Sequence, residues 1–210
     1  MQTMLLIALL WFSGAAKPQD SSPTKPDLSE IASALGTSEF SAITSKYVDG
    51  VLWVAVLQGQ PDRSHLLSIL KKPYRGRFTL VFKRQVDIYD LQSFAPVDTG
   101  RIIAFMLMDS HPDFWVGNTT IFALVGGQWQ LVFGPETCST QVIDLNSDGY
   151  PEVFESCWPD GDGYPEFTTI HAWTGKKFEK LMKTRFSDRF SKRVQAALTR
   201  SAQKHLLYGN

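Results

Sequence analysis

The chain lacks the short motifs that mark the common classes of enzyme. It contains no Gly-x-Ser-x-Gly, no Walker phosphate loop, no Gly-x-Gly-x-x-Gly and no His-Glu-x-x-His. Its four histidines are scattered, without the spacing of zinc ligands. We therefore assign no catalytic residue from the sequence, although a triad or carboxylate pair assembled from distant segments stays open.

An excess of charge of either sign is also missing. Lys plus Arg and Asp plus Glu each total 21, so the formal net charge is zero. The whole chain therefore encodes no long-range attraction to polyanions, and nucleic acid is not expected as a partner. Hydrophobic residues make up 43% of the 210 positions, which is enough for one globular domain with a sizeable core.

Long apolar runs are absent except near the start. Residues 4–12 are apolar but too few to span a bilayer, and small residues follow at 13–16. This order predicts a signal peptide over 1–16, although no Lys or Arg precedes the apolar run; a membrane anchor or a buried helix is the alternative. We expect a secreted, periplasmic or cell-surface protein with a polar linker over 17–26 and no transmembrane segment.

Cysteine is scarce, with Cys138 and Cys157 alone. An even count in an exported protein favours a disulfide, and two buried thiols are the alternative. If the two face each other across an antiparallel hairpin, all facing residue numbers sum to 295. The hairpin tip then falls between Ser147 and Asp148, and the bridge closes its base.

Two sequence markers recur with a period near 50 residues. An aspartate followed by glycine, directly or after one threonine, precedes an apolar segment at Asp49, Asp98 and Asp148. A glycine followed by an aromatic strand recurs with the aromatic residue at Phe78, Trp129 and Phe178. Several short strands per unit at this period are typical of propeller blades or stacked β-repeats.

The sequence therefore predicts a mainly β fold with about three antiparallel, propeller-blade-like repeats of ~50 residues, over 27–183. A single β domain with chance similarity between hairpins is the alternative. Three units are too few for the usual closed propeller. An open stack, a barrel-like arrangement and a propeller completed by another chain all stay open.

A short helix is expected at each end of the repeats. Asp27 is a good N-cap, Glu30 has capping-box spacing and Gly36 ends the first helix. An amphipathic helix is expected over 184–210, with Ser187 as a candidate cap. Its basic side could bind a membrane or polyanion, but packing on the sheet with a solvated basic face is favoured.

One stretch has the residue pattern of a calcium loop. Oxygen-bearing side chains occupy loop positions 1, 3, 5 and 9, at Asp144, Asn146, Asp148 and Glu152. Gly149 stands at position 6, and the carbonyl of Tyr150 falls at position 7. Calcium binds six to eight such oxygens. Glu155 at position 12 completes the EF-hand pattern, but the flanks are β-like and Pro151 suits a turn.

The loop over 142–154 resembles the calcium loops of FG-GAP and VCBS-type repeats, which occur in integrin-like propellers. The resemblance implies Ca²⁺ as the cofactor and a β-repeat scaffold. Asp49 and Asp98 lack the preceding Asp-x-Asn ladder, so no metal is expected in the first two units. A hairpin turn rich in Asp and Asn, without metal, is the alternative.

A second acidic stretch repeats part of this pattern. Asp160, Asp162 and Glu166 form either a weaker second metal site or an acidic turn, and the turn is favoured. Aromatic residues could form a sugar-stacking platform, although most lie inside apolar strands; Trp158 and Tyr164 are the better exposed candidates.

These observations favour an exported calcium-binding β-repeat domain that acts as a binding or interaction module rather than as an enzyme. Its protein or glycan partner is not identified. A carbohydrate-binding module and a secreted hydrolase are the alternatives.

Overall fold

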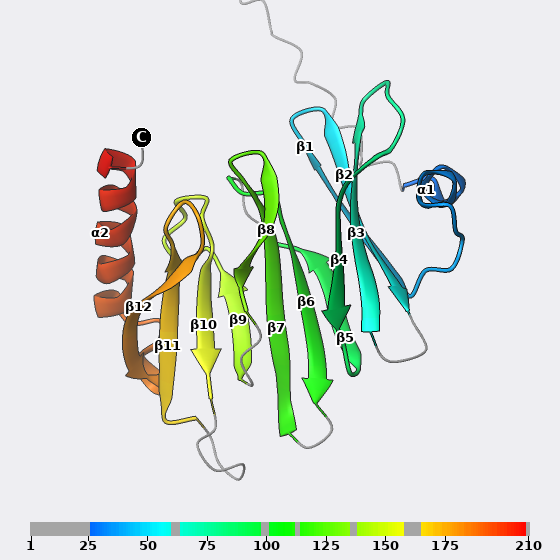
Figure 1. The fold of residues 1–210 in the computed structure, drawn as a ribbon. Coiled ribbons are helices and arrows are strands. Elements are labelled where there is room, and N and C mark those ends of the chain that lie inside the picture. The colour runs from blue at the N-terminus through cyan, green and yellow to red at the C-terminus, as the bar shows by residue number, and fades with distance from the viewer. Residues whose placement is uncertain are drawn as a thin grey trace, which may run out of the picture.

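The computed structural model describes residues 26–59, 64–97, 101–111, 114–134, 138–157 and 165–208. In these residues, twelve strands form three four-stranded antiparallel sheets, with one α-helix before them and one after them (Figure 1). The protein is therefore mainly β, as the sequence predicts. Residues 1–25, which include the predicted signal peptide, lie outside the described residues.

Each sheet is a meander in which strands pair in chain order. Sheet 1 consists of β1 (Ala42–Val48), β2 (Val51–Gly59), β3 (Ser64–Pro73) and β4 (Thr79–Asp87). Sheet 2 consists of β5 (Leu91–Pro96), β6 (Ala104–His111), β7 (Phe114–Val125) and β8 (Gln128–Phe133). Sheet 3 consists of β9 (Ser139–Ile143), β10 (Glu152–Ser156), β11 (Phe167–Trp173) and β12 (Phe178–Arg185). Helix α1 (Leu28–Leu35) precedes the sheets, and a 3₁₀ turn (Phe186–Asp188) and helix α2 (Lys192–Tyr208) follow them.

The two recurring markers fall at equivalent places in these meanders. Asp49 and Gly50 form the tight turn between β1 and β2, with φ of 49° and 77°, and Asp148-Gly149 lies between β9 and β10. Residues 98–100 lie outside the described residues. The glycines of the second marker lie between the third and fourth strands of their sheets, at Gly76, Gly127 and Gly175. The 50-residue period is therefore one four-stranded sheet.

The three sheets pack face to face, because strands such as β2 are apolar on both sides. Trp53, Ala55 and Leu57 point toward sheet 2, and the alternate residues Val54 and Val56 point toward α1. This alternation explains why β2 is a nearly continuous apolar run. Large side chains from both sheets fill the space between sheets 1 and 2, among them Leu67, Ile69, Phe105, Phe122 and Trp129.

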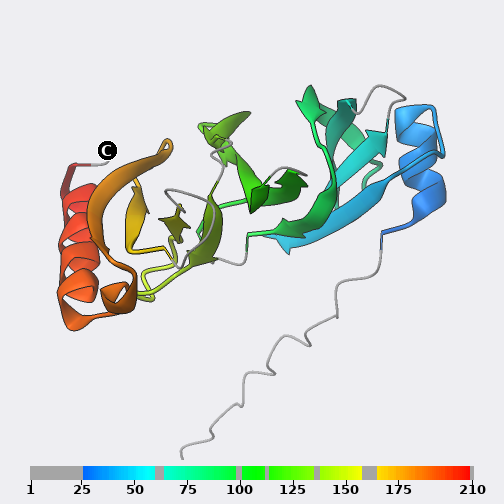
Figure 2. The same ribbon diagram turned by 90° about the horizontal axis from the view of Figure 1, so that it is seen from below.

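The same arrangement repeats along the stack. Ala104, Ile121 and Phe133 of sheet 2 pack against Val153 and Trp173 of sheet 3. The outer face of sheet 1 carries α1, and that of sheet 3 carries α2 (Figures 1 and 2). The described residues thus form an open stack, not a closed barrel, with a helix on each outer face.

Local interactions define the ends of α1, and buried apolar residues pack both helices on the sheets. The Asp27 carboxylate accepts a hydrogen bond from the Ser29 amide over 2.8 Å, and Gly36 ends α1 with φ of 71°. Ile31 is fully buried, whereas Leu28, three residues earlier in the helix, is 56% exposed. In α2, Val194 and Leu198 are buried against sheet 3.

Three local features differ from the sequence-based expectations. Strands β1 and β5 were not predicted, because their polar side chains and partial burial give no apolar run. Helix α2 begins at Lys192 instead of 184, because β12 continues to Arg185 and the 3₁₀ turn follows. The residue before α2 is Ser191, whose Oγ lies 3.5 Å from the Val194 amide, so Ser187 is not its cap.

Candidate metal centre

The predicted loop is the tip of the hairpin formed by β9 and β10. The facing pairs run from Ile143 and Glu152 to Ser139 and Ser156, and each pair of residue numbers sums to 295, as predicted from the cysteines. Cys138 and Cys157 form a disulfide at the base, with 4.4 Å between their Cα atoms. The disulfide and the strand pairing together fix the loop over 144–151.

The Asp144 carboxylate organises the first half of the loop. One oxygen accepts a hydrogen bond from the Asp148 amide over 3.1 Å, and the other accepts from the Gly149 amide over 2.9 Å. Ser147 and Gly149 have φ of 57° and 87°, so the chain folds back around this side chain. The Asp144 carboxylate therefore lies inside the loop.

Asp148 and Asn146 continue this network. An Asp148 carboxylate oxygen accepts from the Tyr150 amide over 2.8 Å, and its second oxygen accepts from the Asn146 side-chain amide over 2.9 Å. The Asn146 carbonyl oxygen accepts from the Asp148 amide over 3.2 Å. These interactions match an Asx-rich turn and leave oxygen lone pairs for further ligation.

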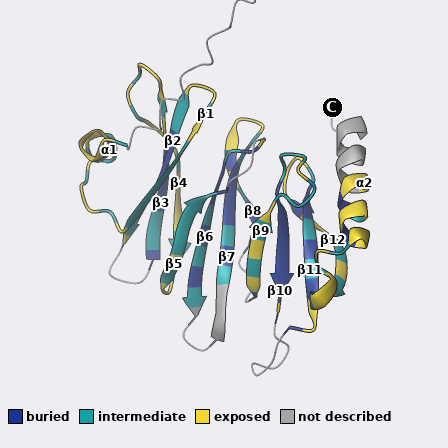
Figure 3. Ribbon diagram, turned by 180° about the vertical axis from the view of Figure 1, so that it is seen from behind, coloured by how far each residue is buried: buried dark blue, intermediate teal, exposed yellow. Residues whose placement is uncertain are grey.

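Glu152 is the most deeply buried acid of the loop. Glu152 is the first residue of β10, a strand that is buried along its whole length (Figure 3), and it is 3% exposed. One carboxylate oxygen accepts from the Leu145 amide over 2.9 Å. Burial raises the pKa of Glu152 to about 7. The hydrogen bond from the Leu145 amide lowers this pKa, whereas the negative charges of Asp148 and Asp144 raise it further.

No described Lys, Arg or His forms a salt bridge with Asp144, Asp148 or Glu152. A basic side chain nearby is that of Arg101, which lies over the Tyr150 ring with its guanidinium carbon 5.3 Å from the ring centroid. The Arg101 amide also donates to the Gly149 carbonyl over 3.1 Å. No motif in the sequence pointed to Arg101; it simply follows the Asp-Thr-Gly marker of the preceding unit.

The donor set of the loop suits a hard cation such as calcium, since it offers carboxylate, amide and main-chain carbonyl oxygens. Three acids, one of them buried, form no salt bridge with a cation of the described residues and give the loop a local excess of negative charge. The carboxylate oxygens of the three acids do not all lie within 4.8 Å of one another. The acids are therefore close together but are not preassembled as a set of metal ligands. When bound, calcium would neutralise the carboxylates and cross-link the loop.

The flanks of the loop exclude the EF-hand architecture, because both are strands instead of helices. Glu155, at position 12 of that pattern, lies in β10 and faces Thr140. Its carboxylate pairs with His171 Nε2 over 3.0 Å, so it is not directed to the loop.

One group of three metal-type ligands with atoms within 4.8 Å does occur among the described residues: Cys138, Glu155 and Cys157. Its two sulfur atoms are joined in the disulfide. This group is therefore no ligand set while the bridge is intact.

The second acidic stretch is described only in part. Asp160 and Asp162 lie outside the described residues, as do the aromatic candidates Trp158 and Tyr164. Glu166 is exposed, and its carbonyl accepts from the Phe186 amide over 2.8 Å. The described tryptophans at 53, 129 and 173 are each 8% exposed, so they belong to the core and not to a sugar-stacking surface.

In comparisons with known proteins, the chain matches no family model and no curated protein sequence. No helix within the described residues has the length and apolar character needed to cross a membrane.

Proposed function

We propose that this chain is an exported, calcium-stabilised β-repeat domain that serves as a binding or interaction module. In this proposal Asp144, Asn146, Asp148, Glu152 and the Tyr150 carbonyl provide the calcium ligands. The three sheets act as propeller-blade-like repeats of the FG-GAP or VCBS type.

The observation that carries the proposal is the burial of Glu152 beside two further carboxylates. A buried carboxylate without a cationic partner is costly, and its raised pKa expresses that cost. A divalent cation bound by the same side chains would remove the cost. The loop geometry supports this role, because strand register and disulfide already hold its two ends.

The disulfide and the recurring sheets support the rest of the proposal. Disulfides persist in oxidising compartments, in agreement with export. Described turns between strands, such as residues 74–75 and 175–177, are exposed, and such loops commonly bind partners on a rigid scaffold.

Calcium titration of the purified protein tests the metal site. We expect saturable binding by calorimetry and a melting temperature higher by about 5–10 °C when free calcium exceeds its Kd a hundredfold. Asp148→Ala should abolish both effects. Asp188→Ala, which removes an exposed acid from the 3₁₀ turn, should retain them.

The metal assignment is rejected if chelator leaves the melting temperature of the wild-type protein unchanged. It is also rejected if Asp148→Ala and Asp188→Ala respond to calcium alike, because the ion would then act on general surface charge.

A further inference from the structure

The disulfide at the base of the β9–β10 hairpin lies beside a buried acid. The sulfur atoms of Cys138 and Cys157 and a carboxylate oxygen of Glu155 all lie within 4.8 Å of one another. The paired strands β9 and β10 separate this group from the acidic loop at the other end of the hairpin. The group is therefore distinct from the predicted calcium ligands, and it consists of atom types that bind zinc.

A cavity gives access to the disulfide. Cys157 is exposed and lines this cavity, which has a volume of about 350 Å³, whereas Cys138 is 5% exposed. The other residues of the lining are Glu155, Glu166, Phe167, Thr169 and Lys183. A thiolate reductant can therefore reach the bridge at its Cys157 end.

A dithiol reductant would open the bridge in two steps. Its first thiolate attacks Cys157 Sγ, so the sulfur–sulfur bond breaks and the electron pair leaves with Cys138 Sγ. Its second thiolate attacks the first sulfur of the reductant, which releases the Cys157 thiolate and closes the reductant into a cyclic disulfide. The two cysteines gain the two electrons that the dithiol loses. The two protons of the dithiol pass to solvent when a metal ion binds both cysteines as thiolates.

Strand pairing would keep the two cysteines together after reduction. Ser139 and Ser156, the neighbouring residues in β9 and β10, face each other across the hairpin. Facing positions have Cβ atoms about 4.5–5.5 Å apart. Two thiolates bound to one tetrahedral zinc ion at a zinc–sulfur distance of ~2.3 Å lie about 3.8 Å apart, which two such positions can supply.

Glu155 is positioned to act as a third ligand. It is 5% exposed, and its Oε2 lies 3.0 Å from His171 Nε2 on the neighbouring strand β11. A carboxylate has enough lone pairs to accept this hydrogen bond and to bind a metal ion at the same time. A water molecule from the cavity can then occupy the fourth tetrahedral position.

The charged residues of the cavity lining fit a zinc complex. Two thiolates and one carboxylate carry three negative charges, of which Zn²⁺ would neutralise two. Lys183 adds a positive charge to the same lining, and its Nζ lies 4.7 Å from the centroid of the Phe167 ring. Glu166, the second acid of the lining, is exposed and does not belong to the group within 4.8 Å. The complex would therefore leave little net charge in the cavity.

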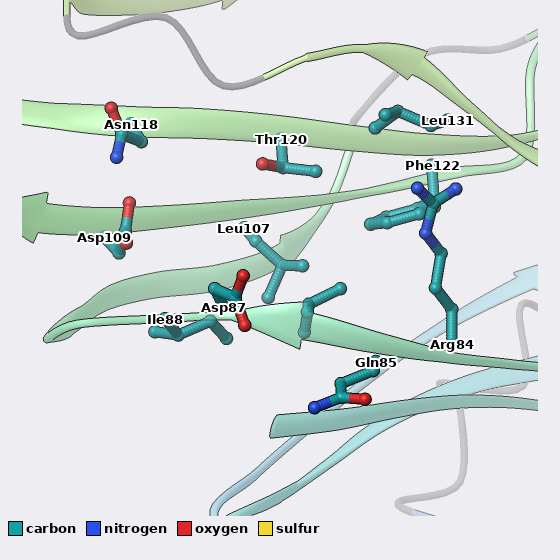
Figure 4. Close-up of a pocket in the computed structure, with 11 residues that line it drawn as sticks. Arg84, Gln85, Asp87, Ile88, Leu107, Asp109, Asn118, Thr120, Phe122 and Leu131 are labelled. Carbon is teal, nitrogen blue, oxygen red and sulfur yellow. The ribbon is translucent and has the colours of Figure 1, made fainter. Parts of the chain in front are cut away.

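A second cavity, between sheets 1 and 2, has a different chemistry (Figure 4). The residues that line it include Asp87 and Asp109 but neither Cys nor His. Thiolates select zinc, whereas carboxylates alone suit harder cations. Among these two cavities, the one at the disulfide is therefore the better zinc site.

We propose that reduction of the disulfide converts this group into a zinc site. Cys138, Cys157 and Glu155 bind the ion, and a water molecule completes the tetrahedron. The base of the hairpin is thus closed by a disulfide under oxidising conditions and by Zn²⁺ under reducing conditions. The site does not depend on calcium binding at the acidic loop.

The test compares zinc binding by the reduced and the oxidised protein. One sample is reduced with dithiothreitol and desalted without oxygen, and both samples contain calcium so that the acidic loop contributes equally. We expect the reduced protein to bind one Zn²⁺ per chain with a Kd below about 1 μM, and the oxidised protein to bind none at this affinity. Co²⁺ in place of Zn²⁺ should give the charge-transfer absorption of metal-bound thiolates in the reduced protein alone.

Three variants assign the ligands. Cys157→Ser removes one thiolate and should weaken zinc binding by at least about a hundredfold. Glu155→Gln keeps the size of the side chain and a hydrogen-bonding partner for His171, and should weaken zinc binding about tenfold. Glu166→Gln, which changes the exposed acid of the same cavity, should bind zinc as the wild type does. Circular dichroism verifies that each variant is folded.

The proposal is overturned if the reduced protein binds no more zinc than the oxidised protein, or if its cobalt complex lacks thiolate absorption. It is equally overturned if folded Cys157→Ser or Glu155→Gln binds zinc with wild-type affinity. If reduction alone unfolds the hairpin, zinc should restore the native circular dichroism, and failure to do so contradicts the proposal. A failed calcium titration would leave these expectations unchanged, because the oxidised protein contains the same acidic loop.

Discussion

The main-chain amide of Arg101 donates a hydrogen bond to the carbonyl of Gly149 over 3.1 Å. This bond joins the segment that leads into β6 of sheet 2 to the tip of the first hairpin of sheet 3. The aliphatic part of the Arg101 side chain lies so close to Gly149 that a Cβ there would come 2.8 Å from Arg101 Cγ. The candidate metal loop is therefore supported by the neighbouring sheet as well as by its own strands.

Replacing Gly149 by alanine should destabilise the protein for two reasons. Its φ of 87° is unfavourable for residues with a Cβ, and the added methyl group meets Arg101. We expect a loss of about 2–4 kcal/mol in the free energy of unfolding, measured by chemical denaturation. Gly50→Ala is the matched control, because Gly50 has φ of 77° but an added methyl group would meet no atom within 4 Å, and it should cost about 1 kcal/mol. Equal losses in the two variants would contradict the contact with Arg101.

The stability of the calcium-free protein should fall as pH rises through the range set by Glu152. The pKa of this carboxyl is about 7 in the folded protein against 4.5 for the ordinary group, so folding favours the protonated form. The stabilisation is full below pH 4.5 and is lost as pH rises to about 7, by roughly 3 kcal/mol. Denaturation at several pH values in chelator measures this slope.

Glu152→Gln provides the control for that measurement, because the neutral amide keeps an acceptor for Leu145 but does not titrate. The difference in slope between wild type and Glu152→Gln isolates the contribution of this carboxyl. Parallel curves for the two proteins would show that Glu152 does not carry the pH dependence.

Removing the disulfide should destabilise the β9–β10 hairpin without changing its register. Cys138 and Cys157 are separated by 19 residues, and a bridge closing such a loop stabilises by about 3 kcal/mol. The double variant Cys138→Ala, Cys157→Ala should lose about this much in the free energy of unfolding. Its calcium affinity should also weaken, since the loop ends are less constrained. Unchanged stability on reduction of the wild type would contradict this expectation.

Helix α2 should contribute to stability through its apolar side and not through its basic side. Leu198 is 1% exposed and packs with Phe154 and Ile170 of sheet 3, so Leu198→Ala should cost about 2–5 kcal/mol. Arg200 lies on the exposed side of the same helix, and Arg200→Ala should change stability by less than about 0.5 kcal/mol. Thermal or chemical denaturation of both variants measures the two losses in stability. Similar losses for Leu198→Ala and Arg200→Ala would show that the basic side of the helix is also packed.

Local features of the fold could be predicted from the sequence because they depend on neighbouring residues. The Asp49-Gly50 turn, the Asp27 cap and the Gly36 end of α1 each follow from the conformational preferences of one or two residues. The register of β9 and β10 followed from Cys138 and Cys157, since facing residues in an antiparallel pair keep a constant sum. Strands β1 and β5 were not predicted, because the sequence of a half-exposed strand that is rich in polar residues resembles that of a loop.

The sequence alone was sufficient to predict the β character, the 50-residue period and the residues of the acidic loop. These features depend on local sequence and on short antiparallel connections. Which faces meet was decided by the tertiary structure alone. Folding placed Arg101 beside Gly149, buried Glu152 in β10, and covered the outer sheets with α1 and α2. It also brought Arg84 of sheet 1 over the Phe122 ring of sheet 2. The physical reason is that stacking is driven by apolar burial, which is not directional and leaves no marker at the residues it brings together.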